Sequence, residues 1–290
     1  MSKLALGTAQ FGSDYGIANK EGKIKLSDAN KILNLAKKNS IELIDTATTY
    51  GDSQTIIGNL GIKDFKIVTK LPDLPKYITD IDSWVEDQVI SSLTLLDVSS
   101  CYGLLIHKSK DLLDKTGKKL INAIKRVKNN GLVEKIGISI YDPSELEYLM
   151  QLNNFDIVQA PLNIIDRRLE KSGWLSKLNK CGVEVHSRSA FLQGLLLMSR
   201  NQLPEKFMKW QNILDRWFLE IEKDNLKALE ECLSYPLSLK EVKYVIVGVD
   251  SYYQFKNLLK VSECRRSNND WSFMISDDQM LINPYNWNKL

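Results

Sequence analysis

The sequence predicts a closed (β/α)8 TIM barrel, an α/β fold of eight parallel strands surrounded by helices. Eight short, mostly apolar segments alternate with segments of helical periodicity between residues 3 and 263, as expected of parallel strands covered by helices. A barrel of this kind typically needs about 250 residues. The alternative, an open doubly wound sheet, usually has a GxGxxG turn after its first strand. The segment LGTAQFG at residues 6–12 does not fit that spacing.

Each predicted strand is a short, mostly apolar run that ends at a polar residue or a glycine. The run KLALGTA begins the series and KYVIVGV ends it. The eight predicted strands are residues 3–9, 41–47, 65–71, 101–108, 133–140, 155–162, 183–190 and 243–249.

A helical segment follows each predicted strand, and several of these helices have recognisable ends. In residues 26–39, apolar side chains recur three and four positions apart. Asp52 or Ser53 is expected to cap one helix, Pro143 to lie in the first turn of another, and Gly131 to end a third. The predicted helices are residues 26–39, 52–61, 79–98, 117–131, 142–152, 168–182, 208–233 and 251–263.

No linker rich in Pro, Gly or Ser divides the chain, so we expect one barrel domain over residues 1–290. Residues 191–207 form a longer mixed region after the seventh strand, and the tail, residues 264–290, has weak periodicity. The tail carries four aromatic residues, Trp271, Phe273, Tyr285 and Trp287. Two roles fit them equally well: packing the tail onto the barrel, or lining the active site.

The composition argues against several classes of function. Lys and Arg total 39 and Asp and Glu total 36, a net charge of +3, which gives no sign of nucleic-acid binding. The four cysteines, Cys101, Cys181, Cys232 and Cys264, include no CxxC pair and are expected to be reduced thiols. Two histidines argue against a metal centre built from several imidazoles.

The chain is also expected to be cytoplasmic, with no membrane partner. No apolar run reaches the roughly 20 residues that cross a bilayer. The N-terminus, MSKLALGTAQ, goes almost directly into the first strand and lacks the apolar region and cleavage site of a signal peptide.

The candidate site consists of the polar residues at the strand ends. In a (β/α)8 barrel the active site lies at the C-terminal ends of the strands. Three successive predicted strands end at an acid, a lysine and a histidine. The general polarity of loops that follow strands does not by itself account for this series of ionisable residues. The strand-end residues, in chain order, are Asp45, Lys70, His107, Ser139, Gln159, Arg188, Ser189 and Gly248.

These residues, with Tyr50, suit proton transfer to a carbonyl oxygen. A nearby Lys70 ammonium would lower the pKa of the Tyr50 phenol, and the Asp45 carboxylate would hold that lysine in place. His107 could bind the same oxygen and orient a substrate carbonyl. None of the four is a good covalent nucleophile, so the reacting partner is expected to come from a cofactor, for example as a hydride.

The sequence here resembles the aldo-keto reductase superfamily over nearly its whole length. The family's Asp, Tyr, Lys and His tetrad matches Asp45 and Tyr50 in DTATTYG, Lys70 in VTKLP and His107 in LLIHK. The segments GLVEKIGISIYDPSEL, IVQAPLNIIDRRL and RSAFLQGLLL resemble the family's motifs at strands five, six and seven.

The resemblance implies hydride transfer between a nicotinamide cofactor and an aldehyde or ketone. The barrel would bind NADPH or NADH in extended form, Tyr50 would donate the proton, and His107 would orient the carbonyl. The GTAQFG, DYGI and RSAFLQGLLL segments resemble a branch associated with bacterial surface sugars, so the small-molecule substrates to test include keto-sugars and nucleotide-linked sugars as well as simple aldehydes. The cofactor contacts implied are Thr8, Asp45, Ser139, Gln159, Arg188, Ser189, Gly248, Asp250, Ser251 and Gln254.

Three positions depart from the family's pattern. Ile140 replaces the Asn that usually follows Ser139, which leaves fewer contacts to the carboxamide. Arg188 stands where many members have an aromatic stacked on the nicotinamide, and its charge would favour the reduced cofactor. Asp250 stands near the place of the usual cation for the adenosine 2′-phosphate, which favours NADH. Lys256 or Lys260 could restore that charge, and the family usually uses NADPH, so the choice of cofactor stays open.

Other interpretations remain. A barrel that binds the cofactor as a redox sensor with little turnover would keep the same residues. A hydrolase or lyase using Asp45 and Lys70 would bind no nicotinamide at all.

His186, inside the seventh strand, is expected to be a hydrogen-bonded core histidine rather than a catalytic one. The sequence does not predict the oligomeric state.

Overall fold

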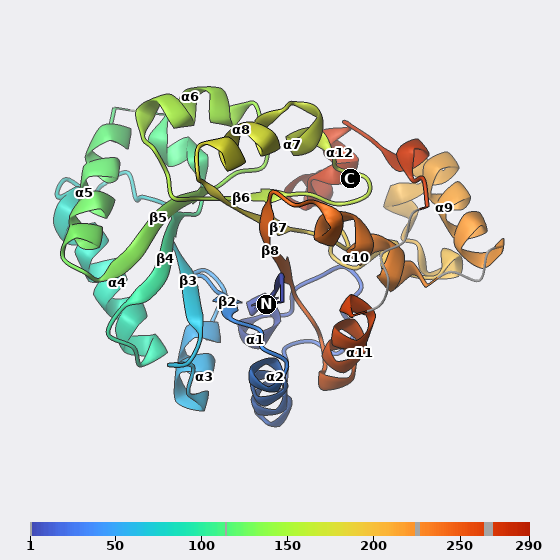
Figure 1. Cartoon of the computed structure of the whole chain (residues 1–290), viewed down its shortest axis with the longest axis horizontal. Helices are drawn as coiled ribbons and strands as arrows, with labels where there is room; N and C mark the ends of the chain where they lie inside the picture. The colour runs from blue at the N-terminus through green and yellow to red at the C-terminus, as the bar shows by residue number, and fades with distance from the viewer. Residues whose placement is uncertain (1, 114, 224–226, 264–268) are drawn as a thin grey trace.

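Eight parallel strands close into a barrel in chain order, β1 to β8 (Figure 1), so the predicted (β/α)8 fold is confirmed. The computed structural model describes residues 2–113, 115–223, 227–263 and 269–290. The strands are β1 Leu4–Gly7, β2 Leu43–Asp45, β3 Lys66–Leu71, β4 Cys101–Ile106, β5 Val133–Ser139, β6 Ile157–Pro161, β7 Glu184–Arg188 and β8 Val242–Val247.

The strand register gathers the polar strand ends at one mouth of the barrel. Asp45 pairs with Gly7 and Val68, and Ser139 pairs with Gln159. Lys70 is the penultimate residue of β3, and Arg188 is the last residue of β7. Below them the interior is packed with apolar side chains, so the polar groups that could take part in a reaction lie at the mouth. That interior cluster consists of Ala5, Leu43, Val68, Leu105, Ile157, Tyr244 and Ile246.

Helices surround the barrel, and a second group of them lies to one side of it (Figure 1). The helices are α1 Ala9–Gly12, α2 Leu26–Lys38, α3 Ser53–Leu60, α4 Ile81–Leu96, α5 Gly117–Asn129, α6 Glu145–Leu152, α7 Arg168–Lys171, α8 Trp174–Lys180, α9 Gln211–Lys223, α10 Ala228–Ser238, α11 Tyr252–Ser262 and α12 Gln279–Ile282. Short 3-10 helices are η1 Ser109–Leu112, η2 Leu195–Leu197, η3 Arg200–Gln202, η4 Glu205–Trp210, η5 Ser272–Met274 and η6 Pro284–Lys289.

Three predicted features of the helices differ in the structure. The helix predicted over residues 168–182 is split into α7 and α8, because Gly173 adopts a left-handed conformation with φ of 79°. Pro143 precedes α6 instead of lying in its first turn. Asp52 is the N-cap residue of α3, but its side chain forms an ion pair with Lys23 and makes no cap bond.

Other predicted boundaries differ more widely. The first strand stops at Gly7; of the residues predicted to extend it, Thr8 is the N-cap residue of α1 and Ala9 is its first residue. The segment predicted as one helix over residues 208–233 contains the end of η4, then α9, then the start of α10. Its residues 224–226, like Cys264 of the four cysteines, lie outside the described residues.

The tail packs against α9 and the mixed region in a second apolar cluster. Trp271 packs edge-on against Trp217 with ring centroids 4.7 Å apart, and Trp287 packs edge-on against Phe207 at 4.8 Å. The indole N–H of Trp271 donates to Glu231 at 2.8 Å. The tail is therefore fixed beside the barrel mouth. No helix in the described part of the chain has the length and apolar character needed to cross a membrane.

Candidate active site

Asp45, Tyr50, Lys70 and His107 come together at the barrel mouth. The Lys70 ammonium donates to the Asp45 carboxylate at 2.6 Å, to the Thr46 carbonyl at 2.9 Å and to the Tyr50 hydroxyl at 3.4 Å. The side chains of Lys70 and Asp45 are 1% and 4% exposed. Such a pair is held rigidly, because separating its charges in a buried site is costly.

His107 faces Tyr50 from the end of β4. The two rings are edge-to-face, with centroids 6.1 Å apart, and His107 Nδ1 lies 3.2 Å from the Thr49 hydroxyl. Burial, assisted by the nearby charges of Lys70 and Arg188, lowers the pKa of His107 to about 3. His107 is therefore neutral at physiological pH and can share one hydrogen bond with a carbonyl oxygen without adding charge.

The expected lowering of the Tyr50 pKa is not what this site shows. Burial raises the pKa of Tyr50 well above its usual value, and the Asp45 carboxylate adds to the rise, while Arg188 opposes it. The Lys70 charge is directed mainly at Asp45, which lies nearer to it than the phenol does. Tyr50 is therefore fully protonated near neutral pH, the state that a proton donor needs.

Close backbone contact fixes the loop that carries Tyr50. A Cβ added to Gly12, the last residue of α1, would lie 1.8 Å from the Tyr50 carbonyl oxygen and 2.5 Å from the Ser53 nitrogen. Gly51 has φ of 57°, and its added Cβ would lie 2.2 Å from the Gly12 carbonyl oxygen. These two segments approach so closely that only glycine fits at both positions.

We expect Gly12→Ala to destabilise the protein by about 3 kcal/mol, because backbone must move to admit the methyl group. The displaced Tyr50 loop should also lower kcat/KM of any reaction that uses the Tyr50 hydroxyl about 100-fold. Urea unfolding and steady-state kinetics measure the two effects. Gly61→Ala is the control: its added Cβ meets nothing within 4 Å, so it should lose only the roughly 1 kcal/mol that a side chain costs at its φ of 83°. Equal losses in the two variants would contradict the packing explanation.

The four strand-end residues expected at the nicotinamide lie at the ends of three neighbouring strands, β5, β6 and β7. Gln159 donates from Nε2 to the Asp45 carboxylate at 2.7 Å, and Ser139 is its strand partner. Arg188 donates to the Ile140 carbonyl at 3.0 Å and to the Ser189 hydroxyl at 3.3 Å. Its guanidinium stacks on the ring of Tyr141 at 4.4 Å, so one face of the cation is already covered.

The remaining predicted cofactor residues lie after β8, with one exception. Ser251 caps α11 by accepting from the Gln254 backbone, and the Gln254 side chain accepts from the Asp250 backbone at 2.8 Å. Gln10 packs on Gly248, whose added Cβ would lie 2.6 Å from the Gln10 amide oxygen. Burial raises the pKa of Asp250. The exception, Thr8, is fully buried, and its hydroxyl donates to the Asp45 carbonyl at 3.0 Å. Thr8 therefore holds the backbone of Asp45 in place.

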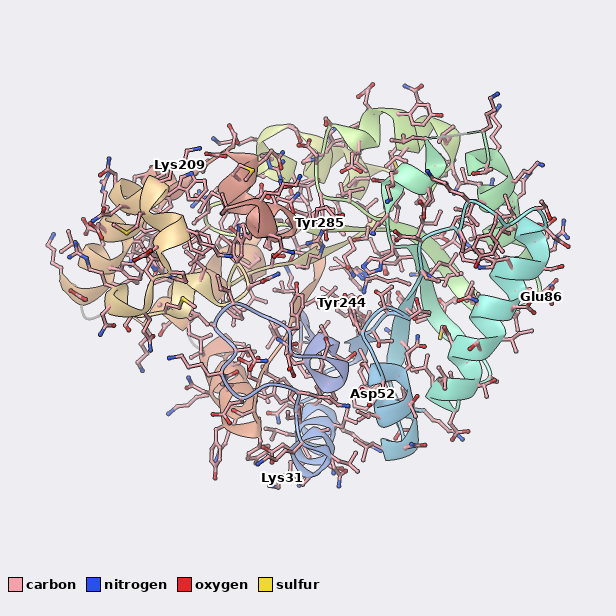
Figure 2. The ribbon with its side chains drawn as sticks, turned by 180° about the vertical axis from the view of Figure 1, so that it is seen from behind. Lys31, Asp52, Glu86, Lys209, Tyr244 and Tyr285 are labelled. Carbon is pink, nitrogen blue, oxygen red and sulfur yellow. The ribbon has the colours of Figure 1, made fainter. Side chains whose placement is uncertain are left out.

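A cavity of about 410 Å³ opens at the mouth, between the first loop, the ends of β5 and β7, and the tail. Tyr15, Tyr141 and Arg188 line it, and all three lie close enough to Tyr50 to influence its pKa. Tyr285 (labelled in Figure 2) and Trp287 line it from the tail. The two roles weighed for the tail aromatics therefore combine, because Trp287 both packs the tail and borders the cavity.

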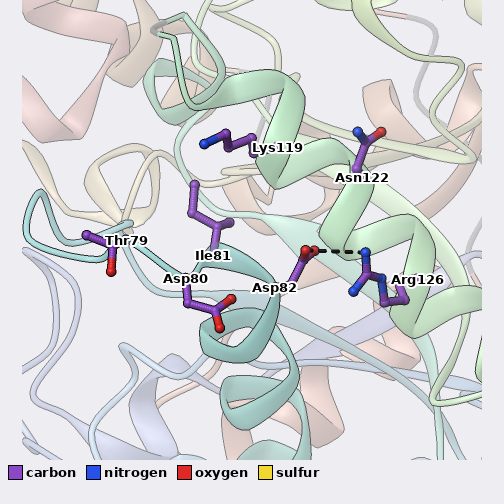
Figure 3. Close-up of a pocket in the computed structure, with 7 residues that line it drawn as sticks. All are labelled: Thr79, Asp80, Ile81, Asp82, Lys119, Asn122 and Arg126. Carbon is purple, nitrogen blue, oxygen red and sulfur yellow. Dashed lines mark ion pairs between the residues drawn. The ribbon is translucent and has the colours of Figure 1, made fainter.

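A second cavity, of about 440 Å³, lies between α4 and α5 on the outside of the barrel (Figure 3). Figure 3 shows Asp82 of α4 pointing at Arg126 of α5, and the two form an ion pair at 3.3 Å. Both side chains are about half exposed. This arrangement is typical of a solvated contact between neighbouring helices.

His186 is buried but is not fully hydrogen-bonded, contrary to expectation. Its Nε2 lies 3.4 Å from the Glu184 carboxylate and its ring packs edge-on against Tyr244. Its Nδ1 has no hydrogen-bond partner among the described residues. These neighbours lie toward the N-terminal ends of the strands, away from the mouth.

Sequence reasoning missed several residues of the mouth. Tyr141 directly follows a predicted strand, so the strand-end rule could have found it. Thr49 and Gln10 carry no such signal, because their partners, His107 and Gly248, are distant in sequence. Lys206 lies in the mixed region, where no periodicity indicated that it would reach the cavity.

The comparisons with known proteins agree with the fold. The profile described as "Aldo/keto reductase family" matches residues 3–274. The chain is 25% identical to an uncharacterised oxidoreductase, YqkF, of Bacillus subtilis, over 92% of each chain. Two solved structures have similar folds. One is the holo form of aldo-keto reductase AKR11C1 from Bacillus halodurans, with a TM-score of 0.73 and 21% identity, over 95% of this chain and 94% of that one. The other is the glycerol dehydrogenase AKR11B4 from Gluconobacter oxydans, with a TM-score of 0.70 and 20% identity, over 98% and 93%.

Proposed function

This chain belongs to the aldo/keto reductase family and is an oxidoreductase, and on that premise we propose that it reduces an aldehyde or ketone with NADH or NADPH. The observation that carries the proposal is the buried Lys70–Asp45 pair, at 2.6 Å, with the Tyr50 hydroxyl 3.4 Å from the same ammonium. A protonated phenol beside a neutral imidazole is a proton donor matched to a carbonyl oxygen.

The residues at the mouth fit a nicotinamide cofactor. Ser139 and Gln159 offer a hydroxyl and an amide at neighbouring strand ends, which suits a carboxamide. Ser189, whose hydroxyl accepts from Arg188, offers a further hydroxyl beside them. The bound cofactor would supply the hydride, and all other steps fall to residues of the chain.

In the proposed mechanism, His107 hydrogen-bonds the carbonyl oxygen and holds it toward Tyr50. Tyr50 then gives its hydroxyl proton to that oxygen as negative charge develops there. The Lys70 ammonium, 3.4 Å from the phenol oxygen, stabilises the phenolate that remains. Asp45 keeps Lys70 charged and in position.

The first test is a titration of the purified protein with NADPH and NADH separately, followed by tryptophan fluorescence. Binding of either nucleotide, together with oxidation of the reduced form by a panel of aldehydes and keto-sugars, is the expected result. Binding without turnover of any carbonyl would favour the redox-sensor alternative. No binding of either nucleotide would remove the basis for the reductase mechanism.

Asp250 is proposed to make the protein prefer NADH. A carboxylate at this position repels a 2′-phosphate and can accept hydrogen bonds from a ribose diol. We expect wild-type protein to bind NADH at least about tenfold more tightly than NADPH, and Asp250→Asn to remove most of that preference. The ratio of the two Kd values measures it. Asp87→Asn, which removes an exposed carboxylate from α4, should leave the ratio unchanged. A wild-type preference for NADPH would contradict this role for Asp250.

A further inference from the structure

Two cations border the cavity at the barrel mouth, and acidic residues are absent from its described lining. Arg188 reaches it from the end of β7, and Lys206 reaches it from η4. The other lining residues are neutral and come from the first loop, the end of β5 and the tail. The cavity is therefore electropositive, and Arg188 lies close enough to Tyr50 to oppose the rise in its pKa.

Neither cation is paired with a carboxylate in the part of the chain that the structure describes. Arg188 donates to the Ile140 carbonyl at 3.0 Å and the Ser189 hydroxyl at 3.3 Å, which uses two of its five N–H donors. Lys206 donates to the Trp287 carbonyl at 3.2 Å. Both side chains are partly buried. Cations withdrawn from water without a counter-charge favour the binding of an anion.

Aromatic rings hold the two cations in place. The Arg188 guanidinium stacks on Tyr141 at 4.4 Å, and Tyr141 lies 6.2 Å from Tyr285 between ring centroids. The Lys206 ammonium lies 5.6 Å from the centroid of the buried Phe207 ring. The guanidinium is thus presented with fixed orientation, which suits recognition of planar or multi-oxygen anions.

We propose that the cavity selects carbonyl substrates that carry a carboxylate or phosphate group, bound by Arg188 and Lys206 while the carbonyl meets Tyr50. The inference rests on the proposed reductase function. It adds a substrate class to that function: an aldehyde or ketone with an anionic group at a distance from the reacting carbon. The cations act as binding residues, because the carbonyl itself is placed by Tyr50 and His107.

The experiment compares matched carbonyls that differ in the anionic group. The carboxylate pair is succinic semialdehyde and butanal, and the phosphate pair is D-glyceraldehyde 3-phosphate and D-glyceraldehyde. We expect kcat/KM for the anionic member of at least one pair to exceed that of its neutral partner by about tenfold or more. The pair with the larger ratio identifies carboxylate or phosphate as the preferred group.

Arg188→Gln and Lys206→Gln should each lower this anionic-to-neutral ratio by about tenfold. Lys209→Gln is the matched control, since Lys209 is an exposed lysine three residues further on (Figure 2) that lies outside the cavity lining. It should leave the ratio unchanged. Ratios near one in wild-type protein, or ratios that the two substitutions do not change, would overturn the proposal. If the two substitutions weaken NAD(P)H binding and lower kcat/KM equally for both members of a pair, the cations bind the cofactor. That outcome would overturn the proposal as well.

A binding measurement separates failure of this inference from failure of the proposed function. Succinate and its neutral analogue succinamide are titrated against tryptophan fluorescence, with Trp287 in the cavity wall as a reporter. Succinate binding that Lys206→Gln weakens about tenfold supports the anion site even if no carbonyl is reduced. Equal binding of succinate and succinamide overturns it even if the reductase activity is present.

Discussion

Tyr50→Phe should lower kcat/KM for carbonyl reduction about 1000-fold, the largest catalytic effect expected of a single substitution in this protein. The change removes one hydroxyl, the proposed proton donor, and retains the ring that packs edge-on against His107. The Lys70–Asp45 pair keeps its 2.6 Å contact without the phenol, so the fold of the site should persist.

Two measurements and a control variant make this test specific. Initial rates of NAD(P)H oxidation with the best carbonyl of the panel give kcat/KM. Tryptophan fluorescence gives the Kd of the nucleotide, which should change less than threefold, because in the proposed mechanism the phenol donates a proton and does not anchor the cofactor. Tyr77→Phe is the control, since the Tyr77 side chain is 81% exposed. Activity in Tyr50→Phe within a few-fold of wild type would exclude Tyr50 as the donor.

Lys70→Met should produce the largest loss of stability, about 3 to 5 kcal/mol in the free energy of unfolding. The substitution removes the ammonium but leaves the Asp45 carboxylate buried beside the apolar interior of the barrel. That carboxylate keeps its hydrogen bond from Gln159, at 2.7 Å, but loses its counter-charge. Urea unfolding monitored by circular dichroism measures the loss as a lower midpoint at constant slope.

A double variant, Asp45→Asn with Lys70→Met, separates charge burial from other effects of the lysine. Asparagine retains an oxygen that can accept from Gln159, so the double variant should recover most of the stability that Lys70→Met loses. It should still be a poor reductase, because the cation beside Tyr50 is gone. If the double variant is less stable than the single one, the loss in Lys70→Met does not come from an unpaired carboxylate.

The barrel could be predicted from the sequence because its signals are local and repeated. Each short apolar run followed by a helical repeat specifies one unit, and eight such units close only as a barrel of parallel strands. Helix boundaries were harder to predict. The break at Gly173 depends on one left-handed residue, and the cap expected of Asp52 was lost to an ion pair with Lys23, distant in sequence.

The four residues of the proposed tetrad could be selected from the sequence because each follows or ends a recognisable strand. Their electrostatic state could not. The sequence suggested that Lys70 lowers the pKa of Tyr50. In the folded site, burial raises that pKa, and the Lys70 ammonium pairs mainly with the Asp45 carboxylate. The extent of desolvation depends on every atom that surrounds a group, so sequence spacing does not give even the direction of the net pKa shift.

The sequence by itself determined the fold class, the family and the set of polar strand ends at which chemistry can occur. Only the tertiary structure brought Lys206 of η4, Trp287 of the tail and Arg188 of β7 around one cavity. The physical reason is that strand and helix patterns arise from neighbours along the chain, whereas a cavity forms where segments with no shared periodicity meet. The charge in that cavity is set by which cations the fold leaves without an acidic partner among the described residues.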